Sequence, residues 1–313
     1  MTTPPPEPSA AGTTGPGDAT GAAGSGADGG AAPALRGGNG STAAPPPGPP
    51  LEIEVFTGPE SALFATSSLI CGTRDAILVD AQLTRGAGRE LAEWIAGKAR
   101  QLLAVVITHP HPDHYFGVEE VLRLFPAAQV LAAPPVVAAI AATAAAKTAE
   151  WRPVLGADIP EHPVLPRPLR PLPLMIDRQL IRVLMLGQSD CSDSTVVHVP
   201  GSRTVIAGDF VGNGTHLWTA ETTPEQRTAW LANLDRIAAL APDRLIAGHR
   251  APGQGDDPAR ILGFTRDYLH DFDQLLTEHP DDAEALVTTM AQAYGELTLP
   301  AFLTAGARAN TDR

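Results

Sequence analysis

The sequence predicts an α/β protein in which strands and helices alternate to build two layered sheets. Two observations support this class. Short apolar runs of strand composition alternate with longer segments whose apolar residues recur at helical spacing. The residues best suited to chemistry follow directly after apolar strands, and strands that end together form a crevice where such residues converge. Residues 51–313 are sufficient for one large domain with a full core.

The expected elements follow one another from residue 51 onward. Apolar, β-branched runs bounded by turn residues indicate strands at 51–56, 63–71, 76–79, 103–107, 128–132, 180–186, 196–199, 204–207 and 244–247. Apolar residues at every third or fourth position indicate helices at 87–99, 115–125, 135–151, 223–240, 258–277 and 282–294. Seven prolines within residues 153–175 favour a long loop there.

The first 50 residues differ from the rest of the chain. Gly, Pro and Ala occupy 34 of these positions, and no aromatic residue is present. Such a segment cannot bury enough apolar surface to offset the entropy lost on ordering, so we expect disorder. It also lacks the basic and apolar regions of a signal peptide. We therefore expect a disordered tail at 1–50 and one domain at 51–313, with the helices of 258–294 at its C-terminal end.

Charge and cysteine content limit the expected partners. The net charge is −13 and no Lys/Arg cluster is present, which disfavours nucleic acid as a partner. Cys71 and Cys191 form neither a disulfide framework nor a CxxC site, so a cytoplasmic location is expected. Pro134 and Pro135 interrupt the apolar run of 127–146, which favours a packed helix over a membrane span. A small-molecule substrate is the expected partner, and the oligomeric state stays open.

One stretch carries most of the metal-binding chemistry. The apolar strand at 103–107 leads directly into Thr108-His109-Pro110-His111-Pro112-Asp113-His114. Neutral imidazole and carboxylate are standard ligands for zinc and similar divalent ions, and four of them within six residues cannot all serve packing. The two prolines stiffen the loop and lower the entropy lost on metal capture. This stretch therefore predicts a metal site.

The pattern His109-x-His111-x-Asp113-His114 after a strand resembles the signature of the metallo-β-lactamase-fold hydrolases. The resemblance continues through Leu78-Val79-Asp80, Ala207-Gly208-Asp209 and Gly248-His249. It implies an αββα sandwich of two mixed sheets flanked by helices, with a metal site at one edge. Zn²⁺, as one ion or two, is the expected cofactor, and another divalent metal would also suit these ligands.

The resemblance also assigns the metal ligands. It gives His109 and His111 to a first position, and Asp113, His114 and His249 to a second, with Asp209 bridging the two. Asp80 would accept a hydrogen bond from a ligand imidazole, although a role as a helix or turn cap is the alternative.

The chain departs from the family pattern at one ligand. The first position normally has a third histidine in a Gly-His-Ser/Thr block, and this chain has Gly187-Gln188-Ser189 there. A glutamine oxygen is a weaker ligand than imidazole for zinc, so Gln188 is expected to be a weak ligand at best. Asp190 and Cys191 are close enough to substitute, but we expect a turn residue and a small buried side chain. Two metals, one metal in the second position, or a loss of chemistry are the alternatives.

The expected activity is hydrolysis of a small carbonyl substrate (ester, lactone, thioester or amide) by a metal-bound hydroxide. Asp113 would orient the nucleophile and carry its proton to the leaving group. Tyr115, His216 and Trp218 are further candidates for contact with substrate or with a metal ligand. The alternatives are an iron-dependent oxidoreductase of the same fold and a non-catalytic metal- or ligand-binding protein.

Overall fold

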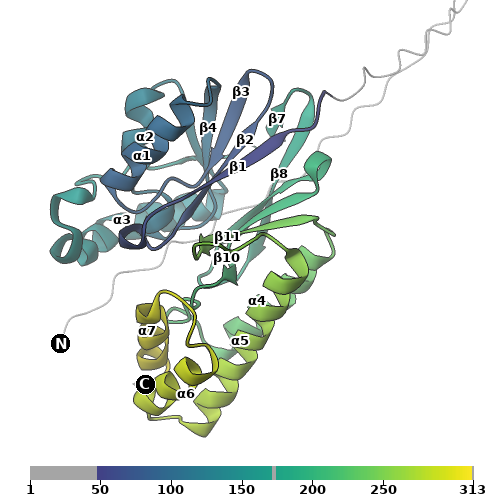
Figure 1. The fold of residues 1–313 in the computed structure, drawn as a ribbon. Helices are drawn as coiled ribbons and strands as arrows, with labels where there is room; N and C mark the ends of the chain where they lie inside the picture. The colour runs from purple at the N-terminus through teal and green to yellow at the C-terminus, as the bar shows by residue number, and fades with distance from the viewer. Residues whose placement is uncertain (1–47, 171–173, 312–313) are drawn as a thin grey trace, which may run out of the picture. The chain divides into compact units, whose positions relative to one another are not determined.

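Two mixed β-sheets form the centre of the fold (Figure 1). The computed structural model describes residues 48–170 and 174–311. The first sheet has the strand order β1 (Glu52–Thr57), β2 (Thr66–Cys71), β3 (Asp75–Val79), β4 (Gln101–Ile107), β5 (Gln129–Ala132) and β6 (Arg167–Pro168). Its first three strands pair antiparallel, and β3 to β6 pair parallel. The second sheet has the order β11 (Arg244–Arg250), β10 (Thr204–Asn213), β9 (Ser194–Val199), β8 (Gln179–Gly187) and β7 (Leu174–Ile176).

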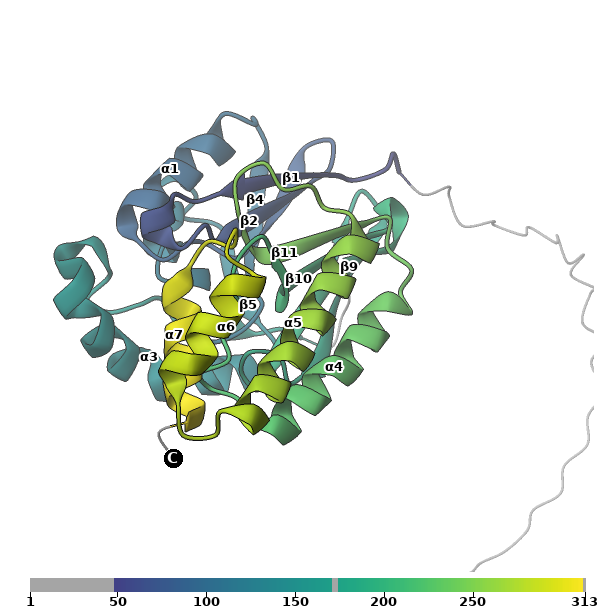
Figure 2. The same cartoon turned by 60° about the horizontal axis from the view of Figure 1, so that its bottom comes forward.

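Helices cover the outer face of each sheet. The helices of the first half are α1 (Arg85–Ala96), α2 (Val118–Leu124) and α3 (Pro134–Leu155). Those of the second half are α4 (Pro224–Ala238), α5 (Pro258–Glu278), α6 (Ala283–Ala293) and α7 (Pro300–Thr311), which Figure 2 shows gathered on one side of β9, β10 and β11. Local sequence sets the helix starts: Thr84 accepts a hydrogen bond from the N–H of Ala87, and Thr223 with Gln226 forms a capping box.

Three groups of buried apolar side chains define the layers. Ile77 and Val106 of the first sheet pack with Ile206 of the second, so the inner faces of the sheets share one core. The neighbouring residues Leu78 and Val105 point to the opposite face and pack against α1, α2 and α3. A third group joins the outer face of the second sheet to the C-terminal helices. This arrangement confirms the predicted αββα sandwich.

Several element boundaries differ from the prediction. The second strand begins at Thr66, because Leu63 and Phe64 adopt left-handed backbone conformations (φ of 62° and 51°) that end the strand run. The helix expected to end near 151 continues to Leu155 through Pro153, and the expected loop at 153–175 contains β6 and the start of β7. Helix α7 was not predicted at all.

Of the predicted tail at 1–50, only positions 48–50 belong to the described residues. Among the helices in the described ranges, none combines the length and apolar character needed to cross a membrane.

Gly88 on α1 packs directly against the backbone of the next helix. A Cβ atom there would lie 2.8 Å from the Gly117 carbonyl oxygen and 2.9 Å from its Cα, both of which are backbone atoms that cannot move independently. Gly88→Ala should therefore lower the free energy of unfolding by about 1–3 kcal/mol, despite the better helix propensity of alanine. Urea unfolding measures this change.

Gly263 on α5 is the matched control, because nothing outside its own helix lies within 4 Å of a Cβ built there. Gly263→Ala should raise the free energy of unfolding by about 0.5–1 kcal/mol. Equal stabilisation by both substitutions would contradict the close approach of α1 and α2.

Candidate metal centre

The candidate ligands come from strand ends and loops of both sheets. Strand β4 ends at Ile107 and delivers the stretch 108–114, whose last three residues form a short 3-10 helix, Pro112–His114. The loop between β8 and β9 carries Asp190 and Cys191. Asp209 lies where the pairing of β10 with β11 is irregular, and His249 lies near the end of β11.

These side chains form two groups, each with its ligand atoms within 4.8 Å of one another. All of them are buried apart from Asp209, which is half-buried. The members of the first group are His109, His111, Asp190 and Cys191, and those of the second are Asp113, His114, Asp209 and His249.

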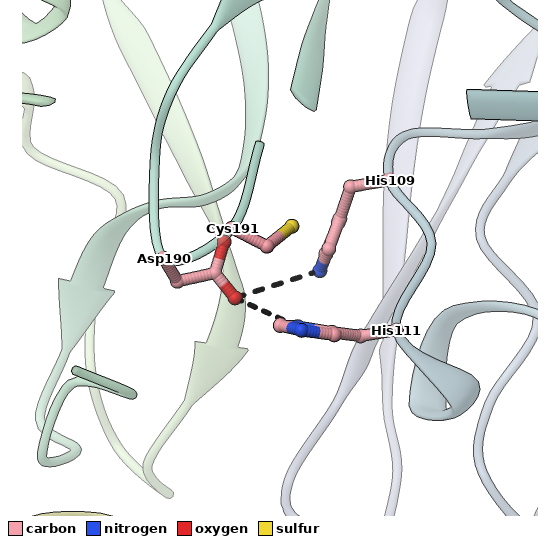
Figure 3. Close-up of side chains that lie close together, drawn as sticks. All are labelled: His109, His111, Asp190 and Cys191. Carbon is pink, nitrogen blue, oxygen red and sulfur yellow. Dashed lines mark ion pairs between the residues drawn. The ribbon is translucent and has the colours of Figure 1, made fainter. Parts of the chain in front are cut away.

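Asp190 completes the first group. Its Oδ2 lies 2.8 Å from His111 Nδ1 and 3.9 Å from His109 Nε2. Figure 3 shows the carboxylate pointing between the two imidazole rings, with the Cys191 side chain beside it. Ser189 holds the other carboxylate oxygen by donating its hydroxyl at 2.6 Å. A carboxylate from this loop therefore lies against both histidines.

Asp190 therefore lies against both histidines of the position to which the resemblance assigned Gln188. The side-chain amide of Gln188 donates to the Ser189 backbone carbonyl at 2.9 Å. The backbone carbonyl of Gln188 accepts a hydrogen bond from the Asn233 side chain. As expected, Asp190 lies in a bend of the loop and Cys191 is a small buried side chain, and both also lie in the first group. The Gly-x-Ser pattern at 187–189 pointed to Gln188, whereas the carboxylate that reaches the histidines belongs to Asp190, two residues later.

Asp209 connects the two groups. In the second group, His249 Nε2 lies 3.0 Å from Asp113 Oδ2 and 3.1 Å from Asp209 Oδ2, and His114 Nε2 lies 3.5 Å from Asp209 Oδ1. Asp209 Oδ2 is also 3.7 Å from His109 Nε2 of the first group. One carboxylate therefore faces ligand nitrogens of both groups.

Partners on the outer nitrogens orient three of the imidazole rings toward the centre. Asp80 Oδ2 lies 2.9 Å from His114 Nδ1, Thr108 Oγ1 lies 2.9 Å from His109 Nδ1, and the Leu63 carbonyl lies 2.7 Å from His249 Nδ1. Asp80 also accepts both the backbone N–H and the hydroxyl of Thr108. Asp80 thus lies where the resemblance implied, against a candidate ligand imidazole.

Several inward-facing atoms have no hydrogen-bond partner among the described residues, although they are buried: His109 Nε2, His114 Nε2, Asp190 Oδ2 and Asp209 Oδ1. Leaving such atoms unpaired costs free energy, and native proteins rarely do so without a bound water or ion. Imidazole nitrogens and carboxylate oxygens are donors that divalent ions of the zinc type prefer. These residues therefore fit a divalent cation in each group.

Histidines and carboxylates of the centre lie close enough to shift one another's pKa values. Burial lowers the pKa of His109 below its ordinary value. Burial opposes protonation of His114 too, but the nearby carboxylates, first that of Asp113, hold the His114 pKa well above 6.5. The same contact outweighs burial at Asp113 and holds its pKa well below the ordinary value. The centre therefore keeps ionised oxygens facing inward, which favours a cation there.

A cavity of about 50 Å³ opens onto the centre, with His111, Asp113, Asp209 and His249 at its base. Trp218 lines this cavity and packs edge-to-face against Phe302, with ring centroids 5.3 Å apart. The other walls come from residues that we did not predict from sequence: Leu63, Lys147, Glu150, Trp151, Glu221 and Phe302. They lie on α3, α7 and two loops that are far apart in sequence, so no local pattern marks them as one wall.

Two of the predicted contact residues lie away from this cavity. Tyr115 is fully buried in the core between the first sheet and its helices, and burial raises the pKa of its phenol. His216 is buried with its Nδ1 3.0 Å from the Tyr268 hydroxyl, and burial lowers the pKa of His216 to about 4. Neither lines the cavity, because the chain turns both side chains into packed interiors.

The fold and this centre define an αββα protein with two adjacent groups of metal-ligand side chains. The chain belongs to the metallo-beta-lactamase superfamily, whose family model matches residues 61–249. Members of this superfamily bind divalent metals and are mostly hydrolases, so the chain is assigned to a family of metal-binding hydrolases.

Similar proteins are distant in sequence. A beta-lactamase domain protein from Burkholderia ambifaria is 18% identical over 87% of this chain and 88% of that chain, with a TM-score of 0.60. A metallo-beta-lactamase family protein from Thermus thermophilus is 22% identical over 82% and 91%, with a TM-score of 0.57. Among curated proteins, the atrochrysone carboxyl ACP thioesterase of Aspergillus fumigatus is 35% identical over 80 residues, which are 23% of this chain and 18% of that protein.

Proposed function

We propose that this protein is a metal-dependent hydrolase of a small carbonyl substrate: an ester, lactone, thioester or amide. One observation carries the proposal. Buried imidazole nitrogens and carboxylate oxygens without hydrogen-bond partners in the described ranges converge in two adjacent groups at the base of a cavity. Such an arrangement is unfavourable unless ions or waters are bound there, imidazole and carboxylate together favour a cation, and the position at the cavity base would give a substrate access to it.

The ligands would divide between two ions. His109, His111 and Asp190 would hold the first, with Asp209 shared. The second would be held by Asp113, His114 and His249. Zinc suits these donors best, and when bound it polarises a carbonyl and lowers the pKa of a coordinated water to about 7.

The chain's own groups would position the reactants. Asp113 lines the cavity, and its Oδ2 lies 3.0 Å from His249 Nε2. We assign Asp113 to orient the attacking water and to pass its proton to the leaving group. The aromatic walls, Trp151, Trp218 and Phe302, would contact the acyl group and exclude water.

One further observation supports thioesters as the substrate class. The Aspergillus relative is named a thioesterase, although its similarity covers less than a fifth of that protein's length. We include thioesters among the first substrates to be tested. The cytoplasm is the compartment that we propose, supported by the two free, buried cysteines Cys71 and Cys191.

An iron-dependent oxidoreductase is the second candidate, and the observation that favours it is Asp190. With Asp190, the first group contains two histidines and one carboxylate beside Cys191, and two histidines with one carboxylate are the ligand set typical of non-haem Fe(II) enzymes that activate oxygen. Iron content and oxygen consumption distinguish this candidate from a hydrolase.

Substitution of Asp113 tests the proposed activity. Asp113→Asn should lower kcat/KM for the best of a panel of activated esters, lactones and thioesters by about 10²–10⁴-fold, because proton transfer at the leaving group is lost. Asp235→Asn is the control, since Asp235 is 73% exposed and pairs with Arg266 on the surface. Zinc-loaded protein without turnover on any carbonyl substrate would contradict the proposal and favour a binding role, whereas iron with oxygen consumption would favour the oxidoreductase.

A further inference from the structure

The outer nitrogen of His111 differs from those of the other ligand histidines. His111 turns Nδ1 toward Asp190 at 2.8 Å, and its Nε2 lies at an ion-pair distance of 3.4 Å from Glu221 Oε2 without forming a hydrogen bond there. The other three outer nitrogens face two buried side chains and one backbone group: Asp80, Thr108 and the Leu63 carbonyl. The Glu221 side chain is 38% exposed and lines the cavity mouth.

Glu221 is held in place from two sides. Lys147 on α3 donates to Glu221 Oε1 at 2.9 Å, so the second carboxylate oxygen is directed to His111. The loop that carries Glu221 is itself fixed, because the buried Arg227 donates to the Thr222 carbonyl at 2.9 Å and pairs with Asp273 at 2.6 Å. The position of the Glu221 carboxylate therefore does not depend on a freely moving loop.

We propose that Glu221 is a positioning residue for His111, with Lys147 as its anchor. A neutral imidazole has one N–H, and a carboxylate facing Nε2 places that proton there, which leaves the Nδ1 lone pair facing the first group. A carboxylate partner also makes the imidazole a stronger ligand. The inference rests on the proposed function, because it requires that His111 holds a metal.

This arrangement links the first metal position to the cavity mouth. Lys147 and Glu221 both line the cavity, whereas the side chains that face the outer nitrogens of His109 and His114 do not. Metal affinity at the first position should therefore depend on the Lys147–Glu221 pair, and affinity at the second should not.

Chelator competition on the full-length, zinc-loaded protein tests this. Glu221→Ala should weaken the binding of one of the two zinc ions by about 10–100-fold and leave the other unchanged. Glu221→Gln keeps a hydrogen-bond acceptor but not the charge, so it should weaken the binding of this zinc ion less than Glu221→Ala does. Lys147→Met should also weaken the binding of the same zinc ion. It provides a second test if the Glu221 variants fold poorly.

Glu150→Ala is the matched control. Glu150 also lies near Lys147, at 3.6 Å, but it is 59% exposed and this ion pair does not extend to a histidine. The Glu150→Ala protein should bind both ions like the wild type. Thermal unfolding of the metal-free proteins should differ little among the variants, because ion pairs that are partly open to solvent contribute little to stability.

Three outcomes would overturn the inference. Two ions bound equally tightly by the wild type and by Glu221→Ala would remove the role of Glu221 and leave the proposed function intact. Equal weakening of both ions would show a general structural effect instead of positioning of His111. A wild-type protein that binds no divalent ion would contradict both the inference and the proposed function.

Discussion

Asp209→Ala is expected to remove bound metal from both groups and to lower kcat/KM on the order of 10³-fold. The carboxylate of Asp209 lies 3.1 Å from His249, 3.5 Å from His114 and 3.7 Å from His109, so it faces both groups at once. Its loss removes one of the two carboxylates that face each ion and leaves only Asp190 in the first group and Asp113 in the second to offset the positive charge. Metal content per chain and steady-state kinetics on the same preparation measure the two effects.

The fold should survive this substitution. Within the described part of the chain, Asp209 makes its ion pairs only with ligand histidines, and the strand that carries it is held by backbone pairing to β9 and β11. Circular dichroism of Asp209→Ala should therefore match that of the wild type. A variant that keeps both ions and at least half of the activity would show that Asp209 does not connect the groups.

The layered fold could be predicted because its signals are local. Alternating apolar strands and amphipathic helices are visible in short windows, and neighbouring residues such as Ile77 and Leu78 do pack into different cores. The ligand-rich stretch after β4 is also contiguous, so its histidines are brought together whatever the rest of the chain does.

The third residue of the first group could not be predicted in the same way. Which side chain of the loop at 187–195 reaches the histidines depends on backbone turns, including the left-handed residues Gly187 (φ 93°) and Asp193 (φ 63°). A match to a Gly-x-Ser pattern does not specify those torsions. Tyr115 shows the same limit, because its place beside His114 in sequence does not reveal that it turns into the core.

The cavity walls depend on contacts between distant segments. Lys147 and Glu221 are 74 residues apart in sequence, and Phe302 belongs to a helix that the sequence pattern did not indicate. Only the packing of α3, α7 and the loop after β10 brings these residues to one opening.

The assignment of Asp190, instead of Gln188, to the first position gives the second large prediction. Asp190→Ala should lose the first metal while keeping the second, because its Oδ2 faces both His111 at 2.8 Å and His109 at 3.9 Å. Loss of this charged ligand should lower the metal affinity of the first position by at least about 100-fold. The effect should be no smaller than that of removing a residue that only hydrogen-bonds a ligand. Activity should fall with the metal if hydrolysis requires both ions.

Gln188→Ala is the matched control from the same loop. The Gln188 amide bonds only to the Ser189 carbonyl among the contacts of its side chain in the described part of the chain, so its removal should leave both ions in place. Asp190→Asn would separate the effect of charge from that of shape.

Elemental analysis of the wild type, Asp190→Ala and Gln188→Ala, all purified without added metal, tests the metal centre most directly. We predict two divalent ions per chain in the wild type and in Gln188→Ala, one for each group of ligands, and a single ion in Asp190→Ala. Loss of an ion from Gln188→Ala with full retention in Asp190→Ala would contradict the assignment of the first position. Absence of any divalent ion from the wild type would contradict the metal centre itself.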